Sequence, residues 1–173
     1  MTRLLALISA IAFVHLMAGC STDPSKGYSF SGVHDSSIET VAVPIFKNDT
    51  FHTGVEIQLT EDLIKQIQRQ TPWRVTSADK ADAVLTGSIT RIDLRSLSTR
   101  TSVGFVQEMG VQMTVEFEFV DNRSGDTLTK RTGYSALGSF VPANPTGERI
   151  DVGYAGVAQT MARDIVGDLQ STW

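Results

Sequence analysis

The stretch over residues 111–119 constrains the fold of this 173-residue chain more than any other segment. Apolar side chains occupy every second position of it, and Gln, Thr and Glu occupy the positions between. The apolar positions are Val111, Met113, Val115, Phe117 and Phe119. Because successive side chains of a strand point to opposite faces, this alternation predicts a strand with one packed face and one solvated face. Another layer must therefore cover the packed face.

Two amphipathic helices are predicted to supply that layer. The first follows a capping-box pattern in which Thr53 precedes Glu56 by three residues, and Pro72 ends it. Both helices carry an apolar stripe at helical spacing, and the second runs over about residues 150–169. The stripes are Val55, Leu59, Leu63 and Ile67 in the first helix, and Ala158, Met161, Ile165 and Leu169 in the second.

Other segments read as further strands. Residues 40–46 are rich in β-branched side chains, and Pro44 should place that strand at an edge or a bulge. A short strand is predicted at 73–76. The apolar face of the next strand, from residue 83, changes phase after Ile89, which predicts a β-bulge near Thr90 and Arg91.

Residues 96–102 are polar and break the pattern of that strand. Residues 121–126 have the composition of a hairpin turn, and a return strand should cover about residues 127–140. The element order predicts an α+β two-layer sandwich. Two helices pack on one face of a mostly antiparallel sheet of about four strands. Residues 38–173 should form this single domain.

The N-terminal segment has a different character. Arg3 precedes eleven apolar or small residues at positions 4–14, and the run Leu-Met-Ala-Gly-Cys then ends at Cys20, the single cysteine of the chain. An eleven-residue helix spans about 16 Å, too short for a hydrocarbon core of about 30 Å. The segment resembles a bacterial lipoprotein signal, with Met17 where leucine is usual. An uncleaved transmembrane anchor is the less favoured alternative.

This resemblance implies removal of residues 1–19 and lipid attachment to the sulfur and the new amino group of Cys20. Ser21 follows the cysteine, so enterobacterial-type sorting implies the outer membrane. Residues 20–37, rich in Ser, Gly, Asp and Lys, should form a lipidated tether and an extended approach to the domain. Apart from the covalent lipid, no cofactor is predicted.

Charge and chemistry exclude several function classes. Loss of Arg3 changes the net charge from −4 to about −5, which argues against nucleic acid as a partner. His34 and His52 lie in polar turns without a second ligand at metal spacing, so no metal site is predicted. Glu116 and Glu118 read as two acids on a solvated strand face rather than a glycosidase pair. No catalytic residues converge, and a non-enzyme is predicted.

Basic residues give one candidate contact surface. Arg91, Arg95 and Arg100 follow one strand and its extension, and Lys130 and Arg131 lie in another. If these two strands pair, the side chains form a patch suited to phosphate or carboxylate groups. Asp93 interrupts the row, and a solvated face of mixed charge is the alternative interpretation.

Three stretches together resemble a known family. They are GYSFSG at residues 27–32, IETVAVPIFKNDT at 38–50, and ADAVLTGSI at 81–89. With the lipoprotein signal, their order and spacing resemble LptE, the lipopolysaccharide-assembly lipoproteins. The resemblance implies two helices on a sheet of about four strands and tethering to the periplasmic face of the outer membrane. It also implies binding and plugging of the LptD β-barrel translocon, and contact with lipopolysaccharide.

A second resemblance is carried by residues 41–50 alone. The sequence VAVPIFKNDT is also similar to the opening of curli-secretion lipoproteins and of activators of cell-wall synthases. A periplasmic regulator or secretion component is therefore the alternative function.

Overall fold

The computed structural model describes residues 38–99, 106–142 and 149–171. The predicted signal segment, the tether, Cys20, His34 and Arg100 lie outside these residues. Within them the chain forms two helices and a six-stranded sheet. The helices are α2 (Val55–Gln70) and α3 (Ile150–Ser171). The strands are β1 (Thr40–Ala42), β2 (Lys47–Asn48), β3 (Arg74–Val75), β4 (Ala83–Thr99), β5 (Val106–Asp121) and β6 (Thr127–Phe140).

The sheet has the strand order β3-β1-β4-β5-β6, and β2 pairs with β4 beside this path. The long strands β4, β5 and β6 form an antiparallel meander. The short strands pair in parallel, β1 with both β3 and β4, and β2 with β4. The prediction of about four mostly antiparallel strands is therefore wrong: the sheet is mixed and has six strands.

The reason for the difference lies in residues 40–48. The expected single strand is split at Pro44 into β1 and β2, because proline has no backbone N–H to donate to a ladder. Helix α2 then separates β1 from β3. A strand–helix–strand crossover returns the chain to the same end of the sheet, so these strands run parallel.

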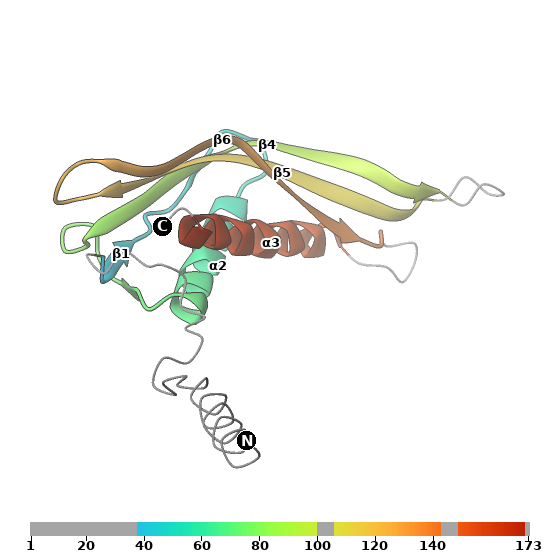
Figure 1. The fold of residues 1–173 in the computed structure, drawn as a ribbon. Helices are drawn as coiled ribbons and strands as arrows, with labels where there is room; N and C mark the ends of the chain where they lie inside the picture. The colour runs from blue at the N-terminus through green and yellow to red at the C-terminus, as the bar shows by residue number, and fades with distance from the viewer. Residues whose placement is uncertain (1–37, 100–105, 143–148, 172–173) are drawn as a thin grey trace, which may run out of the picture. The chain divides into compact units, whose positions relative to one another are not determined.

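Both helices lie on one side of the sheet, with α3 crossing α2 (Figure 1). The predicted apolar stripes of both helices face the sheet. Leu59, Leu63 and Ile67 of α2 are fully buried, and so are Met161 and Ile165 of α3. The sheet supplies the opposite wall of the core. Its largest buried side chains include Leu85, Ile89, Met113 and Phe119. The predicted α+β arrangement of helices against a sheet is confirmed.

The predicted bulge of β4 is also confirmed. The pairing of β4 with β5 shifts register between Ile89 and Arg91. Beyond the shift, Ile92 pairs with buried Met113, so the apolar side chains return to the helix side. The polar residues from 96 on interrupt the apolar pattern of β4 without ending the strand. Strand β4 continues to Thr99 because its backbone keeps pairing with β5, although its side chains are polar.

The start of α2 differs from the predicted capping box. Gly54, not Thr53, is the N-cap residue, with φ 89°, and no side chain caps it. The Glu56 carboxylate lies near the helix start instead. Its pKa is held below the ordinary range because it accepts a hydrogen bond from its own backbone N–H and another from Asn48 Nδ2.

Two glycines mark close approaches between layers. At Gly138 of β6 a Cβ atom would lie 2.7 Å from the backbone nitrogen of Val157, so α3 rests directly on the strand. At Gly87 of β4 the ring of buried Phe46 occupies the place of a side chain. No helix of the described residues is both long and apolar enough to cross a membrane.

Asp82 joins the first residues of the domain to the start of β4. Its Oδ2 atom accepts hydrogen bonds from Glu39 N (3.0 Å), Thr40 N (2.9 Å) and Thr40 Oγ1 (2.8 Å). The Arg123 Nε atom lies 4.0 Å from Oδ1. The hydrogen bond from the Thr40 hydroxyl is the main reason that the pKa of Asp82 lies below its ordinary range.

This geometry predicts a pH-dependent stability contribution from Asp82. A depressed carboxyl pKa stabilises the folded state above the unfolded value of about 3.9, and this contribution is lost as pH falls through the folded pKa. Asp82→Asn should therefore lower the melting temperature at pH 7, and its difference from the unmodified protein should shrink below about pH 4. Thermal unfolding followed by circular dichroism from pH 3 to 7 measures both. A difference that stays constant over that range would contradict the assignment.

Candidate functional site

The sheet has an open face on the side away from the helices (Figure 1). Cross-strand partners share a face, so the register assigns its residues. Hydroxyl, amide and charged side chains dominate it. From β4 they are Thr86, Ser88, Arg91, Asp93 and Arg95; from β5, Gln112, Thr114, Glu116 and Glu118; and from β6, Lys130, Ser135 and Ser139.

Arg91 and Arg95 lie on this open face, as predicted for a row along one strand. Both are exposed, and they pair across the sheet with Thr114 and Gly110. Asp93 lies between them on the same face. The pair forms a short cationic row that is reachable from solvent.

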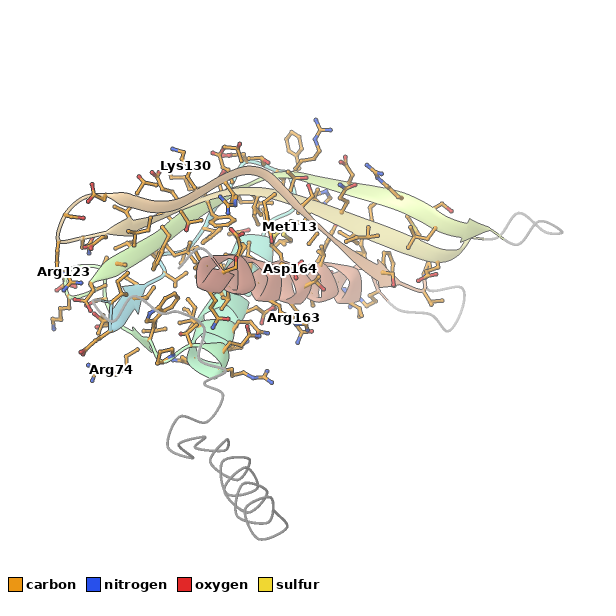
Figure 2. The ribbon with its side chains drawn as sticks, viewed as in Figure 1. Arg74, Met113, Arg123, Lys130, Arg163 and Asp164 are labelled. Carbon is orange, nitrogen blue, oxygen red and sulfur yellow. The ribbon has the colours of Figure 1, made fainter. Side chains whose placement is uncertain are left out.

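Lys130 also reaches the open face, but it is not part of the same row. Strands β4 and β6 do not pair, because β5 lies between them. Figure 2 shows Lys130 on the side of the sheet away from the helices. There its Nζ atom lies 3.4 Å from Glu118 Oε2. The condition for a continuous patch, that the two basic strands be neighbours, is therefore not met.

Arg131 points to the other side of the sheet. It pairs with Phe117, whose side chain is buried in the core. Its guanidinium binds the Asp168 carboxylate of α3 with two contacts, Nε to Oδ2 at 3.0 Å and Nη2 to Oδ1 at 3.1 Å. This bidentate ion pair connects the edge strand to the last helix.

A hollow of about 250 Å³ lies on the open face, where β2 meets the meander. Lys47, Glu116, Glu118 and Lys130 give its lining a mixed charge. The pKa of Glu118 lies below its ordinary range, first because the Thr127 hydroxyl donates to it at 2.7 Å, and then because of Lys130. With Glu118 held in this way, the hollow presents both carboxylate and ammonium groups to polar ligands.

Glu116 makes a weaker contact within the hollow. The nearly buried Ser88 hydroxyl lies 3.4 Å from Glu116 Oε1 and 3.1 Å from Asp49 Oδ2. The structure therefore places Glu116 and Glu118 side by side on a solvated strand face. Among the described residues, no group of three or more His, Cys, Asp and Glu side chains is arranged to hold a metal ion.

Two exposed apolar features were not anticipated from the sequence. Leu97 and Leu137 lie over Gly110 on the open face, each within 3.1 Å of where a Cβ atom of that glycine would be. Leu97 falls in a segment that reads as polar, and only the hairpin register brings it to Leu137. The second feature is Phe51, whose side chain is fully exposed in the turn before α2.

His52 has a partner that the sequence did not indicate. The Tyr154 hydroxyl and His52 Nδ1 share a hydrogen bond of 2.8 Å, and the ring centroids lie 5.2 Å apart. The histidine therefore joins the turn before α2 to α3, across 102 residues of sequence.

Solved structures with this fold share little sequence with the chain. Protein CT253 from Chlamydia trachomatis is 11% identical, with a TM-score of 0.53 over 78% of this chain and 97% of its own. Protein XCC0632 from Xanthomonas campestris is 8% identical, with a TM-score of 0.53 over 80% and 90%. Lipoprotein GNA1162 from Neisseria meningitidis is 12% identical, with a TM-score of 0.44 over 75% and 96%. At these identities the first two matches establish a shared fold alone.

No curated protein matches the chain significantly. A family model does: the one described as LptE, lipopolysaccharide-assembly, matches residues 38–171. That range begins at the first described residue of the domain and ends at the last residue of α3. The chain therefore belongs to the LptE family of lipopolysaccharide-assembly proteins.

Proposed function

We propose that this protein is an outer-membrane lipoprotein that binds and plugs the β-barrel of the lipopolysaccharide exporter and contacts lipopolysaccharide. The observation that carries the proposal is the family match over residues 38–171. The lipoprotein signal that ends at Cys20 supports it, because a lipid anchor holds the domain at the periplasmic face of the membrane. The protein acts as an assembly partner and not as an enzyme.

Co-purification tests the barrel partner. The full-length protein, tagged at its C-terminus and extracted from outer membranes in mild detergent, should recover an LptD-type barrel. Depletion of the protein should lower the lipopolysaccharide at the cell surface. Recovery of a peptidoglycan synthase or a homo-oligomeric ring instead, with unchanged surface glycolipid, would contradict the proposal.

The glycolipid contact is assigned to Arg91 and Arg95, with Lys130 as a separate candidate on the far side of β5. Guanidinium groups match the geometry of phosphate oxygens, and both arginines project from the open face. Arg100, which lies outside the described residues, is a further candidate from the sequence. Arg131, which also belongs to the candidate set, is already bound to Asp168 and has less capacity for a ligand.

The double substitution Arg91→Ser and Arg95→Ser should weaken lipopolysaccharide binding about tenfold. Exposed charge pairs contribute up to about 1 kcal/mol each, and 1.4 kcal/mol corresponds to a factor of ten. Displacement of a fluorescent probe from purified lipopolysaccharide measures the change.

A matched control removes the same charge elsewhere. Arg69→Ser with Arg163→Ser changes two exposed arginines of the helices α2 and α3, which cover the other side of the sheet. Figure 2 shows Arg163 on that side. Binding should change less than threefold in this control. Equal losses in both double variants would indicate a net-charge effect and would contradict the assignment to the open face.

A further inference from the structure

The turn before α2 presents a single aromatic side chain to solvent. Phe51 is 102% exposed, whereas every other Phe and Trp that the structure describes is at most 5% exposed. Ile57, half-exposed, follows in the first turn of α2. An exposed phenylalanine adds nothing to the core, so its position is not explained by folding.

The turn holds Phe51 in this position through a network centred on Asn48. The Asn48 side chain donates to His52 O and Glu56 Oε2, both at 2.7 Å. Its Oδ1 atom accepts from Thr50 N at 2.9 Å and from Thr50 Oγ1 at 2.7 Å. Residues on both sides of Phe51 are therefore fixed by one amide.

A second attachment fixes the far side of the turn. His52 bonds Tyr154 of α3, and the backbone N–H of Asp49 donates to Ile89 O of β4 at 3.0 Å. The phenyl ring is thus carried by a turn bound to both layers of the domain. A backbone turn that is ordered before binding loses less conformational freedom in a complex.

We infer that Phe51 is an anchor residue that inserts into an apolar pocket on a protein partner. Aromatic side chains are enriched in the buried centres of protein interfaces, and a few such residues carry most of the affinity. The inference rests on the proposed function, which supplies the partner as the exporter barrel. It adds the contact residue, which the family match does not assign.

The charge around Phe51 favours a protein over a membrane surface. Residues 48–58 contain Asp49 and Glu56 and no Lys or Arg. Segments that bind anionic membranes carry basic residues beside their apolar side chains, so this turn would be repelled there. A pocket with a neutral or basic rim would complement it.

Affinity measurements on the lipidated full-length protein test the inference, with the purified barrel that it recovers as the probe. Phe51→Ala should raise the dissociation constant at least about 30-fold, the range of an interface anchor. Phe51→Trp keeps an aromatic ring, so its dissociation constant should stay within about threefold of that of the unmodified protein. The same is expected of Leu137→Ala, which truncates an exposed leucine on β6. The melting temperature should be unchanged in Phe51→Ala, because the ring buries no surface.

Other results would overturn the inference. If Phe51→Ala binds the barrel as well as the unmodified protein does, Phe51 is not an anchor residue, while the proposed function stands. If the unmodified protein binds no barrel, the proposed function fails and the inference fails with it. Two further assays test whether Phe51 contacts lipid or a second copy of the protein instead. They are vesicle flotation with phosphatidylglycerol and phosphatidylethanolamine, and sedimentation of the protein alone. Binding or dimerisation that depends on Phe51 in those assays would assign the residue to lipid or to a second copy.

Discussion

Replacement of Gly87 by alanine should lower the free energy of unfolding by about 3 kcal/mol, at the upper end of the usual cost of overpacking a core. A Cβ atom there would meet the ring of Phe46 and would lie 2.5 Å from the Glu116 carbonyl oxygen. Phe46 is 2% exposed and belongs to the core, and the carbonyl belongs to the neighbouring strand. The melting temperature should fall by roughly 10 °C.

Gly167→Ala is the matched control. Gly167 lies in α3 with no atom within 4 Å of the position that a Cβ atom would occupy. Alanine in an exposed helix position is more stable than glycine by about 1 kcal/mol, so this variant should unfold at a slightly higher temperature. Urea titrations of both variants give the two free energies. A stability for Gly87→Ala within 1 kcal/mol of the unmodified protein would show that the Phe46 contact is not tight.

The Cys20→Ala variant should lose the lipid-bound form entirely. Alanine offers no sulfur for the diacylglyceryl group, so the precursor should keep residues 1–19 and remain at the inner membrane. Each buried methylene of an acyl chain contributes about 0.8 kcal/mol, and two or three chains make attachment effectively permanent. Membrane fractionation and labelling with radioactive palmitate measure both effects.

Met17→Leu is the corresponding control, since it restores the residue usual in lipoprotein signals. It should be processed and sorted as the unmodified protein is. Outer-membrane fractionation of Cys20→Ala with its label intact would remove the lipid assignment and, with it, the proposed mode of attachment.

Those parts of the fold that depend on local pattern could be predicted from the sequence. The stripe of Leu59, Leu63 and Ile67 requires a helix with one buried face, and that helix is present as α2. The phase change after Ile89 requires an extra residue in β4, and the register shift is present. In both cases the signal lies within about ten residues and does not depend on distant contacts.

The strand count and direction could not be predicted in the same way. Strand β2 is two residues long, too short for an alternation pattern. Strand β3 is equally short, but it falls within the strand predicted at 73–76. The parallel pairing of Val41 with Val75 and with Ala83 depends on how α2 returns the chain. The missed start of α2 has a similar cause: Thr53 matches the capping pattern, but Asn48 and Glu56 already order the turn.

The candidate basic residues illustrate the same limit at the level of the site. Their sequence positions indicate strands but not which strands are neighbours. The structure separates Arg91 and Arg95 from Lys130 by the whole of β5, and turns Arg131 toward Asp168. The exposure of Phe51 likewise depends on the turn that the hydrogen bonds of Asn48 hold in place, and no local sequence pattern indicates that exposure.

The two kinds of strand pairing have a consequence for the order of folding. Strands β4, β5 and β6 meet through hairpins, whereas Thr40 meets Asp82 across 42 residues. Closing a long loop costs more conformational entropy before any contact forms, so the meander should assemble first and β1 should join last. The first strand of the described domain is then the final one to become ordered. In the proposed lipidated form, more residues would separate Cys20 from the folded part of the domain before β1 joins than afterwards.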